Sequence, residues 1–208
     1  HHVQRVPVAA GYSIGLASHI FLDVITAYGT MIFQPLSRDR YTLDMVFIID
    51  LTLGSLLLLP QLVAWAWRDT ALAAKRVMIM WLFTVAGTAA AYFLVNAAGV
   101  RISPTTAFTA IGIFAVALAL PGLTSAARWP TARYCRLGLV LAAGYLIACG
   151  VAHHIALEKV RTLAAKYQLK AINVAALPAP PSLLRWNGLI QDDSGVARLH
   201  IVLTDPSD

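Results

Sequence analysis

Residues 18–50 read SHIFLDVITAYGTMIFQPLSRDRYTLDMVFIID and contain the ionisable groups that the rest of the chain has to accommodate. His19 and Asp23 are four residues apart, so a helix places both side chains on one face, one turn apart. Asp50 ends the apolar run at residues 46–49. An ionisable group in apolar surroundings is costly unless it is paired, binds a metal ion or faces water. The stretch therefore predicts that His19, Asp23 and Asp50 converge on a divalent metal ion at a membrane surface.

The composition determines the class of protein. Of 208 residues, 59% are hydrophobic and only 12% are charged, whereas a soluble domain carries about 25% charged residues. Residues 77–100, 102–127 and 137–157 contain no Asp, Glu, Lys or Arg, and about 20 apolar residues are enough for a helix to cross a bilayer. The sequence predicts an all-α polytopic membrane protein whose main partner is the lipid bilayer.

We expect about five transmembrane helices, over residues 6–32, 43–67, 77–99, 104–124 and 137–157. A transmembrane domain would then occupy residues 1–157, followed by an extramembrane tail at 158–208. The tail reads as a short helix at 158–173, a stiff Pro-rich linker at 177–182, and a β-hairpin in which two β-branched runs flank the sequence DDSG. An isolated hairpin is only marginally stable in water, so we expect it to pack against the membrane domain or a partner.

The net charge of +6 indicates cytoplasmic anchoring charges and contact with anionic lipid. No nucleic-acid partner is expected, because no basic run with interleaved aromatic residues appears. The loops after the second and fourth spans each carry three basic residues, so the positive-inside rule predicts that both are cytoplasmic. The 34–44 loop, the 100–104 turn and the tail would then lie outside, although four basic residues in the tail argue against this: Lys159, Arg161, Lys166 and Lys170. The oligomeric state is not readable from the sequence.

The pattern SH-x3-D-xx-T-x-YGT, followed by a proline, Arg-rich residues and FIID, resembles the bacterial inner-membrane metal-dependent hydrolases, including LexA-regulated ones. The strong resemblance covers about residues 15–53, and a weaker one lies at Pro178–Trp186. It implies a multi-pass protein of the bacterial inner membrane. The family usually has an upstream His-Arg-Gly-x-Thr-His-Ser motif, so we expect an N-terminally truncated member. His1 and His2 could be a remnant of that motif, residues left from an affinity tag, or a chance pair.

A helical His-x3-Asp offers one nitrogen and one oxygen ligand, which suits zinc or a similar divalent ion. The alternative interpretation of His19 and Asp23 is a hydrogen-bonded pair or a proton relay inside a helix bundle. Asp50 is predicted to be a further ligand or the general base for metal-activated water. Its alternative is packing against a Ser, Thr or Tyr partner. No cofactor other than the metal ion is predicted.

Arg40, together with Arg38, lies in the loop beside the predicted site. A guanidinium suits the geometry of a phosphate group, so Arg40 is predicted to be a catalytic residue that contacts a phosphoester. The alternative is an ordinary solvated loop. A second metal ion would need more ligands, which an upstream motif or the group His153, His154 and Glu158 could supply. The latter group also reads as an interfacial cluster at a helix end, which we favour.

The resemblance implies a membrane-bound metal-dependent hydrolase that uses metal-activated water on an ester or phosphoester of a lipid-like substrate. The alternative is a non-catalytic protein, either a small transporter or a proton- or ion-conducting helix bundle. In that case His19, Asp23 and Asp50 would line a polar pathway. Bound zinc in the purified protein would separate the two hypotheses.

Overall fold

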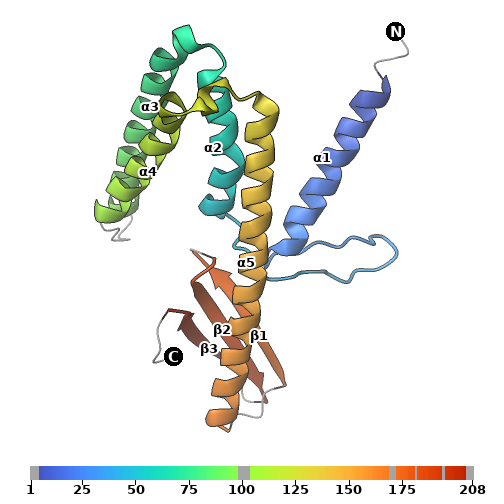
Figure 1. Cartoon of the computed structure of the whole chain (residues 1–208). Coiled ribbons are helices and arrows are strands. Elements are labelled where there is room, and N and C mark those ends of the chain that lie inside the picture. The colour runs from blue at the N-terminus through green and yellow to red at the C-terminus, as the bar shows by residue number, and fades with distance from the viewer. Residues whose placement is uncertain (1–4, 98–103, 169–171, 181, 194, 205–208) are drawn as a thin grey trace. The chain divides into compact units, whose positions relative to one another are not determined.

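The computed structural model describes residues 5–97, 104–168, 172–180, 182–193 and 195–204 (Figure 1). Within them the chain forms five α-helices, one short 3-10 helix and a three-stranded antiparallel sheet. The helices are α1 (Arg5–Ile25), α2 (Leu51–Trp67), α3 (Thr70–Ala97), α4 (Pro104–Leu123) and α5 (Thr131–Lys166), with η1 (Ser125–Arg128) before α5. The strands are β1 (Asn173–Ala179), β2 (Arg185–Asp192) and β3 (Gly195–Val202).

Three helices in the described residues are long and apolar enough to cross a membrane, with spans at Val8–Ile25, Thr70–Leu94 and Thr131–Lys166. Two shorter apolar helices lie at Leu51–Trp67 and Ile111–Leu123. The mostly helical class was therefore predicted correctly, but only three of the five expected spans reach full length in this part of the chain. The chain divides into two compact units, one of residues 1–53 with 143–208 and one of residues 54–142.

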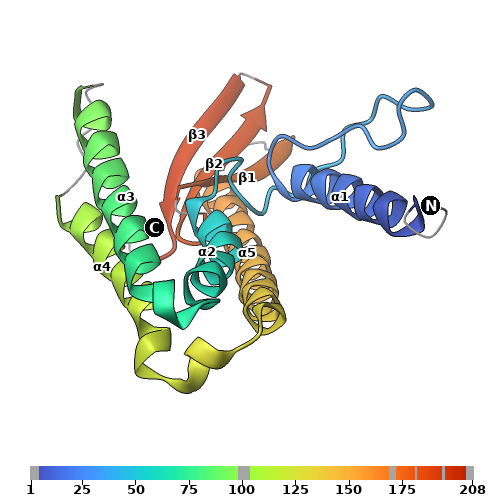
Figure 2. The same ribbon diagram turned by 90° about the horizontal axis from the view of Figure 1, so that it is seen from above.

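In the unit of residues 54–142, the core forms around Val63, Ala64, Leu118 and Tyr134, which are all buried. Trp67 Nε1 donates a hydrogen bond of 2.9 Å to the Leu118 carbonyl oxygen, and the Tyr134 hydroxyl donates one of 2.7 Å to the carbonyl oxygen of Ala126. Helices α3 and α4 run side by side in both views (Figures 1 and 2). Tyr134 is buried and Trp67 is half-buried, and the polar tip of each ring has the hydrogen-bond partner that such a position requires.

In the other unit, the sheet packs against the last half of α5. One face of α5 carries buried residues at every fourth position, and this face meets buried residues of all three strands: Ala152, Ala156, Val160 and Ala164 against Ala176, Trp186, Ile190 and Ile201. The approach is close, because a Cβ atom added to Gly188 would lie 2.7 Å from a Val160 methyl carbon. The predicted hairpin is confirmed as β2 and β3, and α5 together with β1 supplies the support that an isolated hairpin lacks.

Helix α5 is one continuous helix of 36 residues, which corresponds to a length of about 54 Å. The separate short helix expected at 158–173 is therefore wrong. The charge-free run ends at residue 157, but the small-residue face of α5 continues to Ala164, and the sheet covers it. The length of α5 exceeds the ~30 Å thickness of a hydrocarbon core, so the helix is longer than one membrane crossing requires.

Two other boundaries differ from the expected ones. The second helix begins at Leu51 rather than near residue 43, because the Asp50 side chain caps its first turn by accepting the Leu53 backbone N–H. The segment expected as a stiff linker contributes its first residues to β1, which pairs with β2 from Asn173 opposite Gln191 to Ala179 opposite Arg185. Pro178 is compatible with this strand because β1 lies at the edge of the sheet. Most of the turn expected at 100–104, including Arg101, lies outside the described residues.

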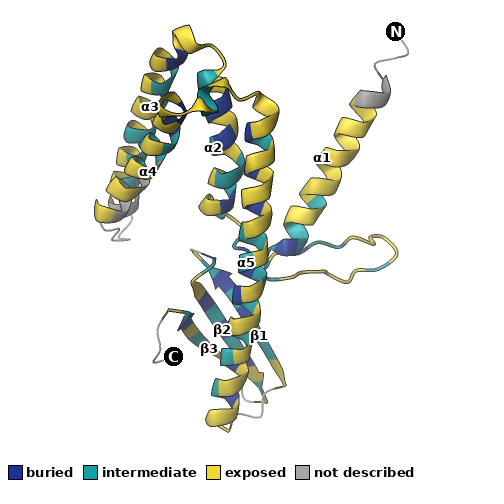
Figure 3. Cartoon of the chain, in the orientation of Figure 1, coloured by how far each residue is buried: buried dark blue, intermediate teal, exposed yellow. Residues whose placement is uncertain are grey.

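The side chains of α1 are mostly exposed along its length (Figure 3). They include large apolar residues: Val8, Tyr12, Ile14, Leu16 and Phe21. Apolar surface of this extent is stable when lipid or a protein partner covers it. The exposure agrees with the interpretation of α1 as a membrane-crossing helix.

We expect Ile201→Ala to destabilise the packing of the sheet on α5 by about 2–5 kcal/mol, because the isoleucine side chain is buried and its loss leaves a cavity. Ile201 is 1% exposed, whereas Val196 on the same strand is 65% exposed. The measurement is thermal or denaturant unfolding of the full chain in detergent micelles. Val196→Ala is the matched control and should change stability by less than about 0.5 kcal/mol; equal effects of the two substitutions would contradict the packing described here.

Candidate metal and catalytic site

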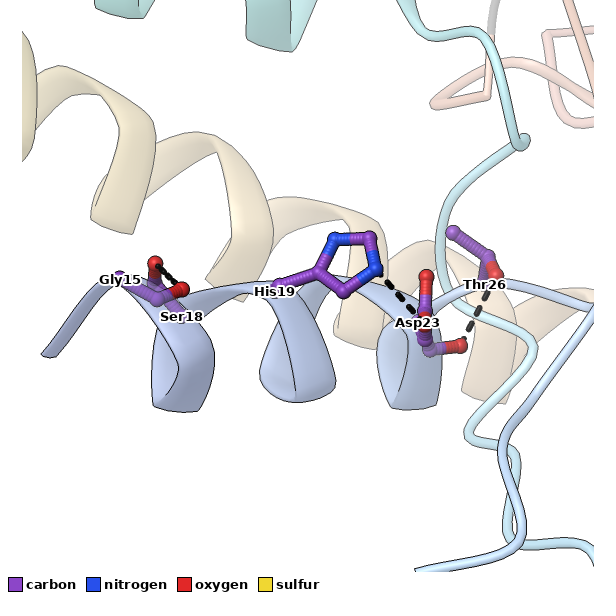
Figure 4. A network of polar contacts seen from close by, with 5 residues as sticks. All are labelled: Gly15, Ser18, His19, Asp23 and Thr26. Carbon is purple, nitrogen blue, oxygen red and sulfur yellow. Dashed lines mark hydrogen bonds and ion pairs between the residues drawn. The ribbon is translucent and has the colours of Figure 1, made fainter. Parts of the chain in front are cut away.

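His19 and Asp23 lie on successive turns near the end of α1, and the imidazole ring points toward the carboxylate (Figure 4). His19 Nε2 is 3.7 Å from Asp23 Oδ2, and the two side chains are 74% and 39% exposed. The predicted proximity of these residues is confirmed. Ligand atoms that each lie about 2.0–2.2 Å from one zinc ion can be this far apart, so the pair fits two positions of a zinc site.

Thr26 terminates α1 directly after these residues. Its backbone N–H lies 3.3 Å from the Asp23 carbonyl oxygen, and its hydroxyl donates to the same oxygen at 2.9 Å. Ile25 is buried, which anchors the end of the helix. The backbone of Asp23 is therefore held in place, while the rest of the described chain covers its carboxylate and the imidazole of His19 only in part.

The Tyr28-Gly29-Thr30 sequence turns the chain at the start of the following loop, whose two arms are joined by a bridge between Thr30 and Tyr41. Thr30 and Tyr41 exchange two backbone hydrogen bonds of 3.0 and 2.9 Å. Gly29 has φ of +65°, and a Cβ atom there would lie 2.7 Å from the Tyr41 carbonyl oxygen. Only glycine meets both conditions. This part of the resemblance motif thus has a structural role, because it sets the path of the loop beside the end of α1.

Arg40 is held against this turn. One of its terminal nitrogens donates a hydrogen bond of 2.8 Å to the Tyr28 carbonyl oxygen, and its guanidinium carbon lies 4.9 Å from the centroid of the Tyr28 ring. Arg40 and Arg38 are both exposed. A guanidinium has five N–H donors, so Arg40 keeps donors for another ligand. Its predicted catalytic role stays a prediction.

Asp50 precedes α2 and caps its first turn. Asp50 Oδ1 accepts a hydrogen bond of 2.9 Å from the Leu53 backbone N–H. Asp50 Oδ2 accepts one of 2.7 Å from the Tyr145 hydroxyl and another from the Ser182 hydroxyl. The buried Ser182 oxygen in turn accepts the Phe47 backbone N–H at 2.9 Å. The carboxylate is therefore satisfied by protein donors, as its alternative interpretation predicted.

The structure brings His19 and Asp23 together but does not complete the predicted ligand set. No three His, Cys, Asp or Glu side chains in the described ranges are grouped so that they could hold a metal ion. A catalytic zinc ion takes three protein ligands, so the pair fits a zinc ion only with at least one further donor. His1 and His2 lie outside the described residues. The metal-ligand roles of His19, Asp23 and Asp50 stay predictions.

The second candidate group, near the end of the fifth predicted span, is dispersed over the surface of α5. His153 packs on Trp186 with ring centroids 5.5 Å apart. Glu158 forms an ion pair of 2.6 Å with Arg161, and His154 is exposed. The expected cluster at a helix end is wrong in its position, because α5 continues to Lys166 and the three residues lie inside the helix.

The partners of Asp50 could not be identified from spacing. Tyr145 lies 95 residues after Asp50, and Ser182 lies 132 residues after it. The available signal is chemical: Tyr145 is a polar side chain inside a charge-free run, and a tyrosine hydroxyl in such surroundings needs a hydrogen-bond partner. The sequence therefore indicates that Asp50 and Tyr145 each need a hydrogen-bond partner, but it does not show that they bond to each other.

Comparison with known proteins bears on the membrane location. Residues 1–94 match a family described as YdjM inner membrane protein. The matched region contains α1, the loop with the YGT turn, α2 and most of α3. No curated protein and no solved structure matches the chain. The match fits a bacterial inner-membrane family, in agreement with the long apolar helices, and its description names no reaction.

We expect Ser182→Ala to destabilise the unit of residues 1–53 and 143–208 by about 1–3 kcal/mol, because the Phe47 N–H loses its acceptor and Asp50 loses a donor. The measurement is unfolding of the full chain in detergent, followed by tryptophan fluorescence. Ser125→Ala is the control, since Ser125 is exposed at the start of η1. An unchanged midpoint for Ser182→Ala would contradict the hydrogen bonds assigned to Asp50.

Proposed function

We propose that the protein is a multi-pass hydrolase of the bacterial inner membrane that depends on a divalent metal ion, with zinc as the first candidate. His19 and Asp23 supply two of the ligands. The observation that carries the proposal is the nitrogen–oxygen pair of 3.7 Å on one face at the end of an apolar helix. The resemblance of residues 15–53 to membrane-bound metal-dependent hydrolases supports the same assignment.

The surroundings of the pair support ion binding over simple pairing. His19 and Asp23 lie within the apolar span Val8–Ile25, and the rest of the described chain covers their side chains only in part. Ionisable groups in such a span are costly unless they are paired, bind an ion or face a water-filled space, and side chains of ligand type that are only partly covered can still accept an ion. A divalent ion held there would supply Lewis acidity, which makes water a better nucleophile near neutral pH.

Arg40 would contact the substrate in this proposal. Its bond to the Tyr28 carbonyl and its packing on the Tyr28 ring fix the guanidinium at the turn that follows α1. A fixed guanidinium with free N–H groups suits a phosphoester oxygen. This supports a phosphoester with a lipid-like body as the substrate class, because such a substrate partitions into the bilayer beside α1.

Asp50 has a different role from His19 and Asp23 in the proposed site. Its oxygens accept bonds from Leu53, Tyr145 and Ser182, so action as a base or ligand would require the release of one of these donors. We assign Asp50 the role of a positioning residue that fixes the end of the loop. A direct role would appear as a change in the pH profile of hydrolysis in Asp50→Asn that Ser182→Ala does not reproduce.

The test is the metal content of the purified protein and its activity on an aryl phosphodiester that releases a coloured product. We expect about one zinc ion per chain, and we expect His19→Ala and Asp23→Ala to lose both the metal and the activity by at least about tenfold, as loss of a zinc ligand should do. Asp39→Ala is the control, because Asp39 is an exposed carboxylate of the loop that bonds to Ser37.

Chelation followed by readdition of zinc separates metal dependence from loss of folding. Activity that falls with the chelator and returns with zinc supports the proposal. A wild-type protein that is free of metal after gentle purification would overturn it and favour the alternative of a non-catalytic transporter or ion-conducting bundle.

A further inference from the structure

An apolar groove lies within the unit of residues 54–142, at the end where α4 leads through η1 into α5. It has a volume of about 280 Å³, and its lining is almost entirely apolar, including Leu59, Pro60, Val63, Leu120, Trp129 and Leu137. The apolar lining suits a hydrocarbon chain rather than a polar ligand. Two helices contribute prolines to the wall, Pro60 from α2 and Pro121 from α4.

A polar hollow shares Trp129 with this groove. It has a volume of about 490 Å³ and is lined by Trp67, Arg68, Asp69, Thr70, Arg128 and Thr131, among others. Because Trp129 lines both spaces, an apolar compartment and a polar compartment meet at one side chain. This is the pattern that an amphipathic ligand requires.

The charges in the polar hollow favour an anion. Arg68 and Arg128 are exposed, and neither guanidinium group forms a hydrogen bond or ion pair with another residue in the described part of the chain. Asp69 is an acidic residue in the lining, and its Oδ1 accepts the Ala71 backbone N–H at 3.0 Å. Asp69 thus compensates the start of α3, whereas the positively polarised start of α5 at Thr131 adds to the charge of the arginines.

The surrounding segments are also basic. Residues 65–76 and 124–136 contain one acidic residue, Asp69, and six basic ones: Arg68, Lys75, Arg76, Arg128, Arg133 and Arg136. Arg76 is engaged with Trp65, since it donates to the Trp65 carbonyl oxygen at 3.0 Å and lies 5.0 Å from the ring centroid. The guanidinium groups of Arg68 and Arg128 therefore remain available for an anion.

The walls of the two spaces are fixed without a ligand. Trp67 is held by its bond to Leu118 and packs tightly on Gly122, where a Cβ atom would overlap the ring. Trp129 packs on Tyr134 with centroids 5.7 Å apart, and Tyr134 is bonded to Ala126. A preformed site costs a ligand less ordering entropy than a site that must assemble.

We infer that this groove and hollow form a binding site for one anionic phospholipid, with an acyl chain in the apolar groove and the phosphate at Arg68 and Arg128. Basic pockets between membrane helices are suited to anionic headgroups. A zwitterionic lipid would bring its own cation toward the arginines, and free phosphate would leave the groove unused. The site is built from residues 54–142 alone and does not depend on the proposed hydrolase activity.

The test is native mass spectrometry of the full chain after release from nanodiscs that contain phosphatidylglycerol and phosphatidylcholine in equal amounts. We expect one retained phosphatidylglycerol per chain. Arg68→Gln with Arg128→Gln should reduce its retention by about tenfold or more, because two basic contacts are lost. The matched control is Arg185→Gln with Arg198→Gln, which makes the same charge change at exposed positions on β2 and β3 and should leave retention unchanged.

A second variant tests the apolar groove without a change in charge. Ala117 lines the groove, so Ala117→Phe should fill it and also displace the retained lipid. Inorganic phosphate at millimolar concentration should not displace the lipid, because it cannot occupy the groove. Equal retention of phosphatidylcholine, displacement by phosphate alone, or an equal loss in the two double arginine variants would each overturn the inference.

Discussion

A carboxylate that sits among apolar residues must have its oxygens satisfied, and Asp50 imposes this requirement on one of the two compact units. Its three donors come from the first turn of α2, from α5 and from the connection between β1 and β2. Each of these segments must therefore reach the same point. Removal of one partner would leave a buried polar group unsatisfied, which costs more than the net contribution of an ordinary hydrogen bond. Asp50 thus determines where three distant parts of the chain meet.

The candidate site depends on this arrangement through the loop between α1 and α2. One end of the loop is fixed by Thr26 and the Gly29 turn, and the other end by Phe47 and Asp50. Arg40 lies between these two anchors and is bonded to Tyr28. A loop held at both ends can keep the Arg40 guanidinium in place beside Tyr28 more firmly than a free loop could, which is the condition for a preorganised site.

Some of these features followed from local sequence, and others did not. The His19–Asp23 pair follows from a spacing of four on a helix, and the hairpin of β2 and β3 follows from two β-branched runs around an Asp/Gly turn. The start of α2 was placed too early because an apolar run does not distinguish a helix interior from an extended segment before a cap. The length of α5 was underestimated because the run of apolar residues ends before the helix does. Strand β1 was missed because its support is a neighbouring strand, which no local pattern reports.

The edges of the small sheet have a consequence for the behaviour of neighbouring molecules. Strand β1 is an edge strand that contains Pro178, which has no N–H group to donate to a further strand. Strand β3, at the opposite edge, presents the exposed residues Arg198 and His200. Proline and charge on edge strands oppose the addition of strands from other chains. The two edges of the sheet therefore carry features that oppose edge-to-edge aggregation.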